Sequence, residues 1–246
     1  MRVPAIRGII DRRILANYHI DPDVIARILP RPFVPHIVNG WAIGGICLIR
    51  LKAIRPRLFP FPFGIGSENA AHRIAVKWME KGQLKHGVYI PRRDTSSWLN
   101  SAAGGTVFPG LHHRADFEVQ ETSDQVSVKM ISRDGKARLH VAGGIESEFP
   151  TASVFGSLQE ASTFFQNGSV GYSVTGSAGR FDGIELRCQN WVVENLTVDR
   201  MESSWFQDSS VFPAGSVQYD CALLMRNINH EWHGLEDLCC PAADVV

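Results

Sequence analysis

The sequence predicts a mainly β protein of the α+β class, with a curved or closed, mainly antiparallel sheet and a few peripheral helices. Polar and apolar residues alternate through most of residues 41–225, as in strands with one buried face. Only two segments carry clear helix start signals, and loops rich in proline and glycine connect the rest. A chain of 246 residues can bury a sizeable core. Without a linker or repeat, we expect one domain over residues 1–246.

Two helices are expected. Asp21 is a favourable N-cap, the next residue is proline, and a second proline ends the pattern, which predicts a helix over residues 22–29. Ser157, with a glutamate three residues later, forms a capping box in front of residues 158–167. Gly168 then supplies a common C-terminal stop.

The strand signals are stronger than the helix signals. Residues 41–51 are almost entirely apolar, which favours a strand buried on both faces. Residues 126–132 and 137–145 alternate on either side of an Asp-Gly pair and predict a hairpin with a tight turn. Residues 184–206 and 216–225 also alternate, which predicts two further strands.

Composition excludes several classes of function. The 25 basic and 25 acidic residues balance, and no basic cluster suggests a nucleic-acid or membrane surface. No apolar run is long enough to span a membrane, and no signal peptide or disulfide pattern is evident, so we expect a cytoplasmic protein. His230 and His233 lack the spacing of a zinc motif, and no nucleotide-binding glycine motif occurs. We expect no metal and no cofactor.

Two adjacent histidines mark the first candidate site, in the segment FPGLHHRADF. Counting strand alternation from Leu111 to Val119 places His113 with the apolar residues, facing the interior, and His112 with the charged ones. A histidine satisfied within an ordinary core explains this pattern equally well. Either histidine is a candidate for general acid or base.

Two further segments carry candidate residues. In GSENAAHRIAV, Glu68 and His72 share one strand face and Arg73 lies on the other, and a carboxylate beside a histidine can tune its pKa. In GVYIPRRDTSSW, Tyr89 and Arg92 stand near a second arginine and an aspartate. Arginine is the natural clamp for a carboxylate substrate, although a surface Arg–Asp pair explains at least one of these arginines.

Several ordered segments resemble the acetoacetate decarboxylase-like superfamily, and more closely its YqjF-like family of uncharacterised proteins. They are IDPDVIARILPRPFVPHIVNGWAIGGICLIRLKAIRPR, SENAAHRIAV, HGVYIPRRDTSS, SVFGSLQEASTFFQNGSVGYS and SSWFQDSSVFPAGSVQYDCALLMRNINHEWH. The resemblance covers nearly the whole chain. It implies a barrel- or cone-like β core with an internal cavity and peripheral helices, and it implies oligomeric relatives.

The resemblance also marks a departure in the chemistry. In the decarboxylase, a lysine pair follows Gly-Phe-Pro, and the first lysine forms a Schiff base with the keto acid. Matching that motif to VFPGL puts Gly110 and Leu111 where the lysines would be. The family's acidic residue matches Glu68, and its pocket arginine aligns with His19. We therefore expect no Schiff-base chemistry.

These residues lead to two functional hypotheses. The first is an enzyme of this fold that acts on an oxo- or hydroxy-acid by proton transfer, hydration or lyase chemistry. Glu68 with His113 or His112 would then serve as acid and base, and Arg92 or Arg73 would hold an anionic substrate. We expect Glu68, Arg92 and His113 to meet in one cavity. The second hypothesis is a non-catalytic protein that binds small molecules in the same cavity.

Overall fold

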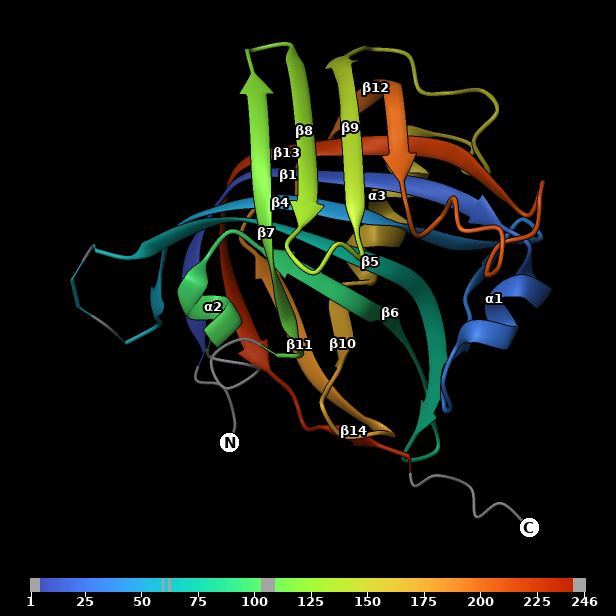
Figure 1. The fold of residues 1–246 in the computed structure, drawn as a ribbon, viewed down its shortest axis with the longest axis horizontal. Coiled ribbons are helices and arrows are strands. Elements are labelled where there is room, and N and C mark those ends of the chain that lie inside the picture. The colour runs from blue at the N-terminus through green and yellow to red at the C-terminus, as the bar shows by residue number, and fades with distance from the viewer. Residues whose placement is uncertain (1–4, 59, 62, 103–108, 241–246) are drawn as a thin grey trace.

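The computed structural model describes residues 5–58, 60–61, 63–102 and 109–240, which form three helices and one sheet of 14 strands (Figure 1). The strands are β1 (Ile6–Ile20), β2 (Val34–Pro35), β3 (Ile37–Val38), β4 (Trp41–Pro56), β5 (Ile65–Glu80), β6 (Gln83–Thr95), β7 (His112–Glu121), β8 (Gln125–Ser132), β9 (Arg138–Ile145), β10 (Val170–Val174), β11 (Arg180–Cys188), β12 (Glu194–Ser203), β13 (Val217–Gly234) and β14 (Leu238–Cys239). The helices are α1 (Pro22–Ile28), α2 (Trp98–Ala102) and α3 (Leu158–Asn167). The predicted mainly β fold with a few helices is confirmed. A single domain over residues 1–246 stays a prediction.

The two predicted helices form where their caps indicate. The Asp21 side chain accepts a hydrogen bond from the backbone N–H of Asp23 at the start of α1. At α3, the Ser157 hydroxyl accepts a bond from the backbone N–H of Glu160, and the chain ends the helix at Gly168. The short helix α2 was not predicted, although the Ser97 hydroxyl accepts a hydrogen bond from the backbone N–H of Asn100 at its start.

The sheet closes on itself in two rings that share five strands. Besides the main path, β5 pairs with β6 and β11 pairs with β13. One ring therefore runs through β6, β7, β8, β9, β12, β13, β1, β4 and β5, and the other through β5, β6, β10, β11, β13, β1 and β4. The strands β13, β1, β4, β5 and β6 form the wall between the two rings. This ring-like closure agrees with the closed sheet that the sequence predicted.

The sheet is mixed rather than wholly antiparallel. Most neighbouring strands run antiparallel, but β6 pairs in parallel with both β7 and β10. Parallel neighbours need a crossover instead of a tight turn, and the segments that contain α2 and α3 supply it (Figure 1). The predicted hairpin is present as β8 and β9, with Gly135 in the left-handed region at φ 72°.

The shared wall is buried on both faces, because each face lines a different ring. Along β1, Ile14 and Ala16 pack in the large apolar core with residues of β8, β9 and β12. The alternate residue Leu15 belongs to a second cluster, which includes residues of α3. Neighbouring residues on these strands therefore point into different rings. This alternation determines which side chains can take part in one site.

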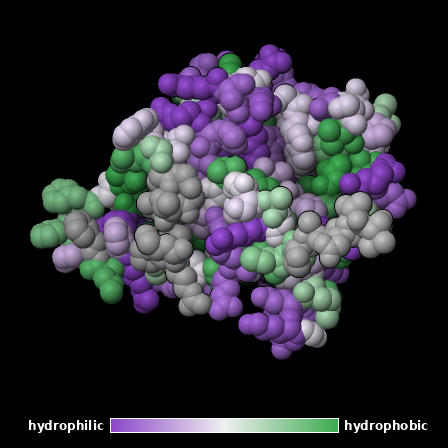
Figure 2. Space-filling view, turned by 60° about the horizontal axis from the view of Figure 1, so that its bottom comes forward, coloured by the Kyte–Doolittle hydropathy of each residue, from purple (hydrophilic) through white to green (hydrophobic). Residues whose placement is uncertain are grey.

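One loop projects away from the sheet. It connects β4 and β5, lies at the left in Figures 1 and 2, and exposes the apolar side chains of Leu58, Phe61 and Phe63. Within the described residues, no helix is long and apolar enough to cross a membrane.

Candidate functional site

A pocket of about 120 Å³ lies inside the seven-stranded ring. Each strand of that ring, β1, β4, β5, β6, β10, β11 and β13, contributes at least one lining residue. Apolar side chains such as Leu51, Ile90 and Trp232 form much of the surface. The charged or strongly polar lining residues are Arg13, Cys47, Asn69, Arg73, Arg93, Asp94, Asn100 and His112.

Three arginines dominate the electrostatics of this pocket. Arg13 comes from β1, Arg73 from β5 and Arg93 from β6. On β4, Cys47 lies opposite Ala71, which in turn lies opposite Arg93, so Cys47 occupies the same row of the sheet. The guanidinium Nε of Arg13 donates a hydrogen bond to Cys47 Sγ at 3.4 Å. The arginines thus surround the position of Cys47.

Arg73 is the most deeply buried of the three, with 4% of its surface exposed. Its guanidinium donates to the Asn17 side-chain oxygen and lies 4.6 Å from the ring centre of Phe165. Its Nε atom is buried and has no hydrogen-bond partner among the described residues. Burial lowers the pKa of Arg73 to about 10, and the positive charge of Arg13 adds to that effect.

Arg13 and Arg93 are also without a carboxylate. Arg93 donates to the Ser173 hydroxyl at 2.8 Å, and burial lowers the pKa of its side chain to about 10. Besides Cys47, Arg13 contacts the Met225 sulfur, at 3.9 Å, and the ring of Trp191 among the described residues. In the described part of the chain, no aspartate or glutamate pairs with any of the three arginines. The pocket therefore carries uncompensated positive charge.

His112 lines the pocket beside Arg93, its partner in the parallel pairing of β6 and β7. The carbonyl of Gly110 lies 3.2 Å from Nδ1 and can only accept, so in the neutral ring Nδ1 carries the proton and Nε2 does not. Burial lowers the pKa of His112 to about 3, and the charge of Arg93 contributes. The ring is therefore neutral at pH 7. His112 and Arg73 were both named as candidate site residues, and both line this pocket; their functional roles stay predictions.

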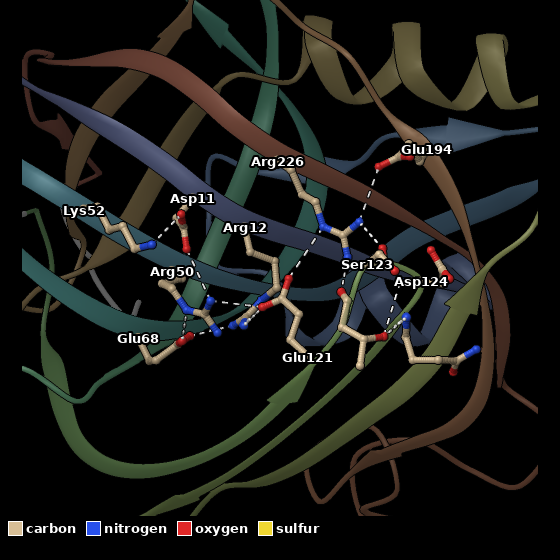
Figure 3. Close-up of polar contacts among 12 residues, drawn as sticks. Asp11, Arg12, Arg50, Lys52, Glu68, Glu121, Ser123, Asp124, Glu194 and Arg226 are labelled. Atoms are coloured by element: carbon tan, nitrogen blue, oxygen red, sulfur yellow. Dashed lines mark hydrogen bonds and ion pairs between the residues drawn. The ribbon is translucent and has the colours of Figure 1, made fainter.

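Glu68 lies in a different place, within a network of paired charges (Figure 3). Its two carboxylate oxygens accept from Arg12 and from Arg50, each at 2.6 Å. Glu121 joins the same network through Arg12 at 3.2 Å and Arg50 at 3.0 Å. Both oxygens of Glu68 therefore bind arginines of β1 and β4, and its contacts among the described residues do not include Arg92.

Arg92 and His113 belong to a third group. Arg92 donates to Asp94 at 2.7 Å and to Asp134 at 2.9 Å, and His113 Nδ1 lies 3.4 Å from Asp134. The His113 side chain is 39% exposed. Neither Arg92 nor His113 lines the pocket, and Glu68 does not line it either. The expected meeting of these three residues in one cavity is not found at this pocket.

The remaining predicted residues also lie outside the lining. His72 is buried on the other face of β5, where its Nε2 is 3.4 Å from the Ser203 hydroxyl. Tyr89 packs in the large apolar core. His19 Nδ1 lies 3.0 Å from Asp220. A functional role for these three side chains stays a prediction.

The strand alternation at the histidines holds, but both faces of β7 are enclosed at this point. His113 shares a face with Ala115, Phe117 and Val119, which pack in or against the large apolar core, whereas His112, on the opposite face, lines the pocket. The two arginines that sequence reasoning missed, Arg13 and Arg93, each follow another arginine. On a strand, such a pair sends one side chain to each face, and that signal was available in the sequence.

The position that matches the decarboxylase lysine cannot hold one in this backbone. Gly110 has φ +82°, and a Cβ atom built there would lie 2.4 Å from Ser173 Cβ. None of the described residues that line the pocket is lysine. The arrangement has no amine for a Schiff base. It offers guanidinium donors for an anion and a neutral imidazole for proton transfer.

Comparison with known proteins agrees with this fold. A family model, DUF2071, described as an uncharacterised conserved protein, matches residues 10–217. A search of curated proteins gave no match. Among solved structures, the acetoacetate decarboxylase of Legionella pneumophila has a TM-score of 0.56 at 13% identity, over 96% of this chain and 88% of the other.

Two further structures are similar. An acetoacetate decarboxylase-like enzyme from Sphingomonas wittichii RW1 has a TM-score of 0.58 at 10% identity, covering 98% of this chain and 94% of that one. The enduracididine biosynthesis enzyme MppR, complexed with pyruvate, has a TM-score of 0.56 at 10% identity, covering 94% and 88%. These identities show a shared fold. With its acetoacetate decarboxylase-like architecture and a family match over most of its length, the chain belongs to the uncharacterised DUF2071 family.

Proposed function

We propose that this protein is an enzyme that binds the carboxylate of a small oxo- or hydroxy-acid in the pocket of Arg13, Arg73 and Arg93, without covalent capture by lysine. The observation that carries the proposal is the set of three guanidinium groups that line one pocket without a carboxylate partner among the described residues.

The energetics favour an anionic ligand. A buried charge without a partner destabilises the folded protein by several kcal/mol, on the order of 3–5 kcal/mol when a partner is removed. Arg73 has the Asn17 amide oxygen as a neutral partner, but among the described residues it has no carboxylate and its Nε atom has no acceptor, and Arg13 repels it. A bound carboxylate would accept two parallel hydrogen bonds from one guanidinium and offset the repulsion.

His112 is the residue proposed to move a proton. Its low pKa makes the free imidazole a weak base. A bound anion beside Arg93 would favour the imidazolium form and raise that pKa toward neutrality. The proposed reaction class is proton transfer next to a carbonyl, hydration, or a related lyase reaction, with the arginines holding the carboxylate.

The absence of lysine from the lining favours non-covalent chemistry. The similar MppR structure is a complex with pyruvate, which supports a substrate of that size class for this fold. Here, however, the glycine at position 110 leaves no space for a side chain. We therefore expect borohydride with pyruvate or acetoacetate to leave no adduct on the protein.

One observation favours a second candidate, a protein that binds small acids without turning them over. The only carboxylate among the described lining residues is Asp94, and it is bound to Arg92. With His112 as the sole candidate base, binding alone is the simpler use of the pocket.

Pyruvate in D₂O separates these candidates. Loss of the methyl proton signal by ¹H NMR would report enolisation, in which a C–H bond breaks and a deuteron from solvent returns to carbon. Titration calorimetry on the same samples would report binding. The variants are Arg73→Met and His112→Gln, with Arg133→Gln as the control, because Arg133 is an exposed arginine paired with Asp116.

The enzyme proposal predicts binding that requires Arg73 and exchange that requires both residues. Binding that requires Arg73 without exchange would favour the binding protein. If pyruvate, acetoacetate and lactate all fail to bind, or bind equally well to Arg73→Met, both candidates are overturned.

A further inference from the structure

The three arginines reach the pocket from three different strands of its wall. Arg13 is on β1 and Arg93 is on β6, with β4 and β5 between them. Three strand spacings separate their backbones by roughly 14 Å. Their side chains reach inward from opposite sides of the pocket toward Cys47. Arg93 donates to Ser173 on β10, whereas Arg73 donates to Asn17 on β1, the strand of Arg13, and the charge of Arg13 acts on it. A carboxylate held by Arg93 therefore leaves Arg13 and Arg73 at the other side.

Arg13 is also the arginine with the weakest acceptors. Its hydrogen bonds go to two sulfur atoms, Cys47 Sγ at 3.4 Å and Met225 Sδ at 3.9 Å. Sulfur is a poor acceptor compared with a carboxylate oxygen. Within the described residues, nothing on the protein neutralises the charge at this side of the pocket, although Arg12, its neighbour on the chain, is paired with two glutamates.

The charges that line the pocket also favour a ligand with more than one anionic group. Arg13, Arg73 and Arg93 contribute three positive charges. His112 is neutral at pH 7, because burial and Arg93 hold its pKa near 3. The Asp94 carboxylate is engaged by Arg92. One monovalent acid would leave an excess of two positive charges in a partly buried space.

We infer that the natural ligand carries two anionic groups, one held by Arg93 and the other by Arg13 and Arg73. The inference rests on the proposed function and names its substrate class as short diacids. The pocket limits their length: its volume is about 120 Å³, and a cavity of about 150 Å³ accommodates benzene. Diacids with three or four carbons, such as malonate and succinate, match this size.

Titration calorimetry with matched acids tests the inference. Malonate is compared with propionate and succinate with butyrate, so that each pair shares its carbon number and differs in one carboxylate. We expect each diacid to bind the wild-type protein at least about tenfold more tightly than its monoacid, because a second charge-assisted contact forms.

Variants of Arg13 show whether a preference for diacids comes from a contact with Arg13 or from the overall positive charge of the pocket. In Arg13→Met, the ratio of the two dissociation constants should fall below about threefold, while Arg13→Lys should retain part of the preference because the charge remains. Arg133→Gln, at an exposed arginine, should keep the wild-type ratio. Circular dichroism and thermal melting show whether each variant is folded. If Arg13→Met does not fold, Arg13→Lys still tests the contact.

The outcomes distinguish the two proposals. If monoacids bind through Arg73 but diacids bind no more tightly, the inference is overturned and the proposed function stands. If the diacid preference survives in Arg13→Met, the second anion does not bind Arg13 and the inference is wrong. If no acid binds, both proposals fail.

Discussion

Arg12 and Arg13 are neighbours on β1, yet they lie in opposite electrostatic environments. Arg12 is completely buried and binds Glu68 and Glu121 (Figure 3). Arg13 faces the other ring, where it meets two sulfur atoms and an aromatic ring. The alternation of a strand buried on both faces separates them. Paired charge on one face suits a structural role, and unpaired charge on the other suits a ligand.

The same division recurs on β6. Arg92 binds Asp94 and Asp134, whereas the described part of the chain gives Arg93 the Ser173 hydroxyl and no carboxylate. Two different strands thus place a paired arginine toward one ring and an unpaired arginine toward the other. Residue type does not distinguish a structural arginine from a candidate ligand group in this protein. The presence of a carboxylate within reach does.

The largest expected effect on stability comes from replacing Arg12, and its neighbour Arg13 for comparison, by methionine. Arg12→Met should lower the free energy of unfolding by about 3 kcal/mol, because it leaves two partly buried glutamates short of a partner. Arg13→Met should change it by less than about 1 kcal/mol, because no carboxylate loses a partner. Urea denaturation measures both. Equal losses of unfolding free energy in the two variants would show that the two faces of β1 do not differ in this way.

Substitution of Gly110 tests whether a side chain fits beside Ser173, on the face that carries the unpaired arginines. Gly110→Ala should cost about 2–3 kcal/mol, because the backbone has φ +82° and the new Cβ overlaps Ser173, the partner of Arg93. Gly110→Lys should be at least as unstable and should form no borohydride adduct with pyruvate. Denaturation and mass spectrometry check these results. A stable Gly110→Lys protein that forms the adduct would show that the pocket still accommodates the decarboxylase lysine.

Acid should destabilise the protein through its buried histidines. Burial, with a contribution from Arg92, lowers the pKa of His72 to about 3 from an ordinary value of 6.5. Below pH 6.5 the unfolded chain therefore takes up a proton that the folded chain does not, and stability falls as the pH decreases toward 3. Between pH 6.5 and 5 this amounts to about 2 kcal/mol for one such group.

Denaturation of wild type and His72→Gln at pH 7 and pH 5 measures this contribution. Any direct cost of the substitution appears at both pH values and cancels in the comparison. The variant should lose less stability on acidification than the wild type. An unchanged difference between the two pH values would mean that His72 is protonated in the folded protein.

The smallest expected effect is a gain in stability. Arg73→Met removes a buried charge that has an unpartnered Nε atom and is repelled by Arg13, while keeping much of the side-chain volume. Without ligand, the variant should be more stable than wild type by about 1–2 kcal/mol. Arg12→Met is the matched comparison, with the opposite sign. Destabilisation by Arg73→Met would indicate that Arg73 holds the fold together.

The fold could be predicted from sequence because its signals are local. Asp21 and Ser157 mark the starts of helices, and alternation marks the strands, whatever the rest of the chain does. The ring closure is different, since it depends on β11 reaching β13 and β6 reaching β10. No local pattern carries that information.

The candidate site was predicted only in part for the same reason. Arg73 and His112 were named as candidates because of their residue types, although the strand alternation placed His112 with the charged residues and His113 in the interior. The partners of Glu68 could not be read from the sequence, because Arg12 and Arg50 lie 56 and 18 residues away from it along the chain. Alternation shows which residues share a face, but not which face encloses a pocket. That depends on β10 and β11, which complete the seven-stranded ring.

A crystal structure of the protein soaked with pyruvate tests the central claim most directly. The account predicts a carboxylate inside the seven-stranded ring, with an oxygen within hydrogen-bond distance of Arg73 Nε and no covalent bond to any lysine. The paired arginines, Arg12 and Arg92, should keep their carboxylate partners. Pyruvate bound elsewhere, or a pocket in which Arg73 Nε is capped by the protein's own carboxylate, would contradict the account.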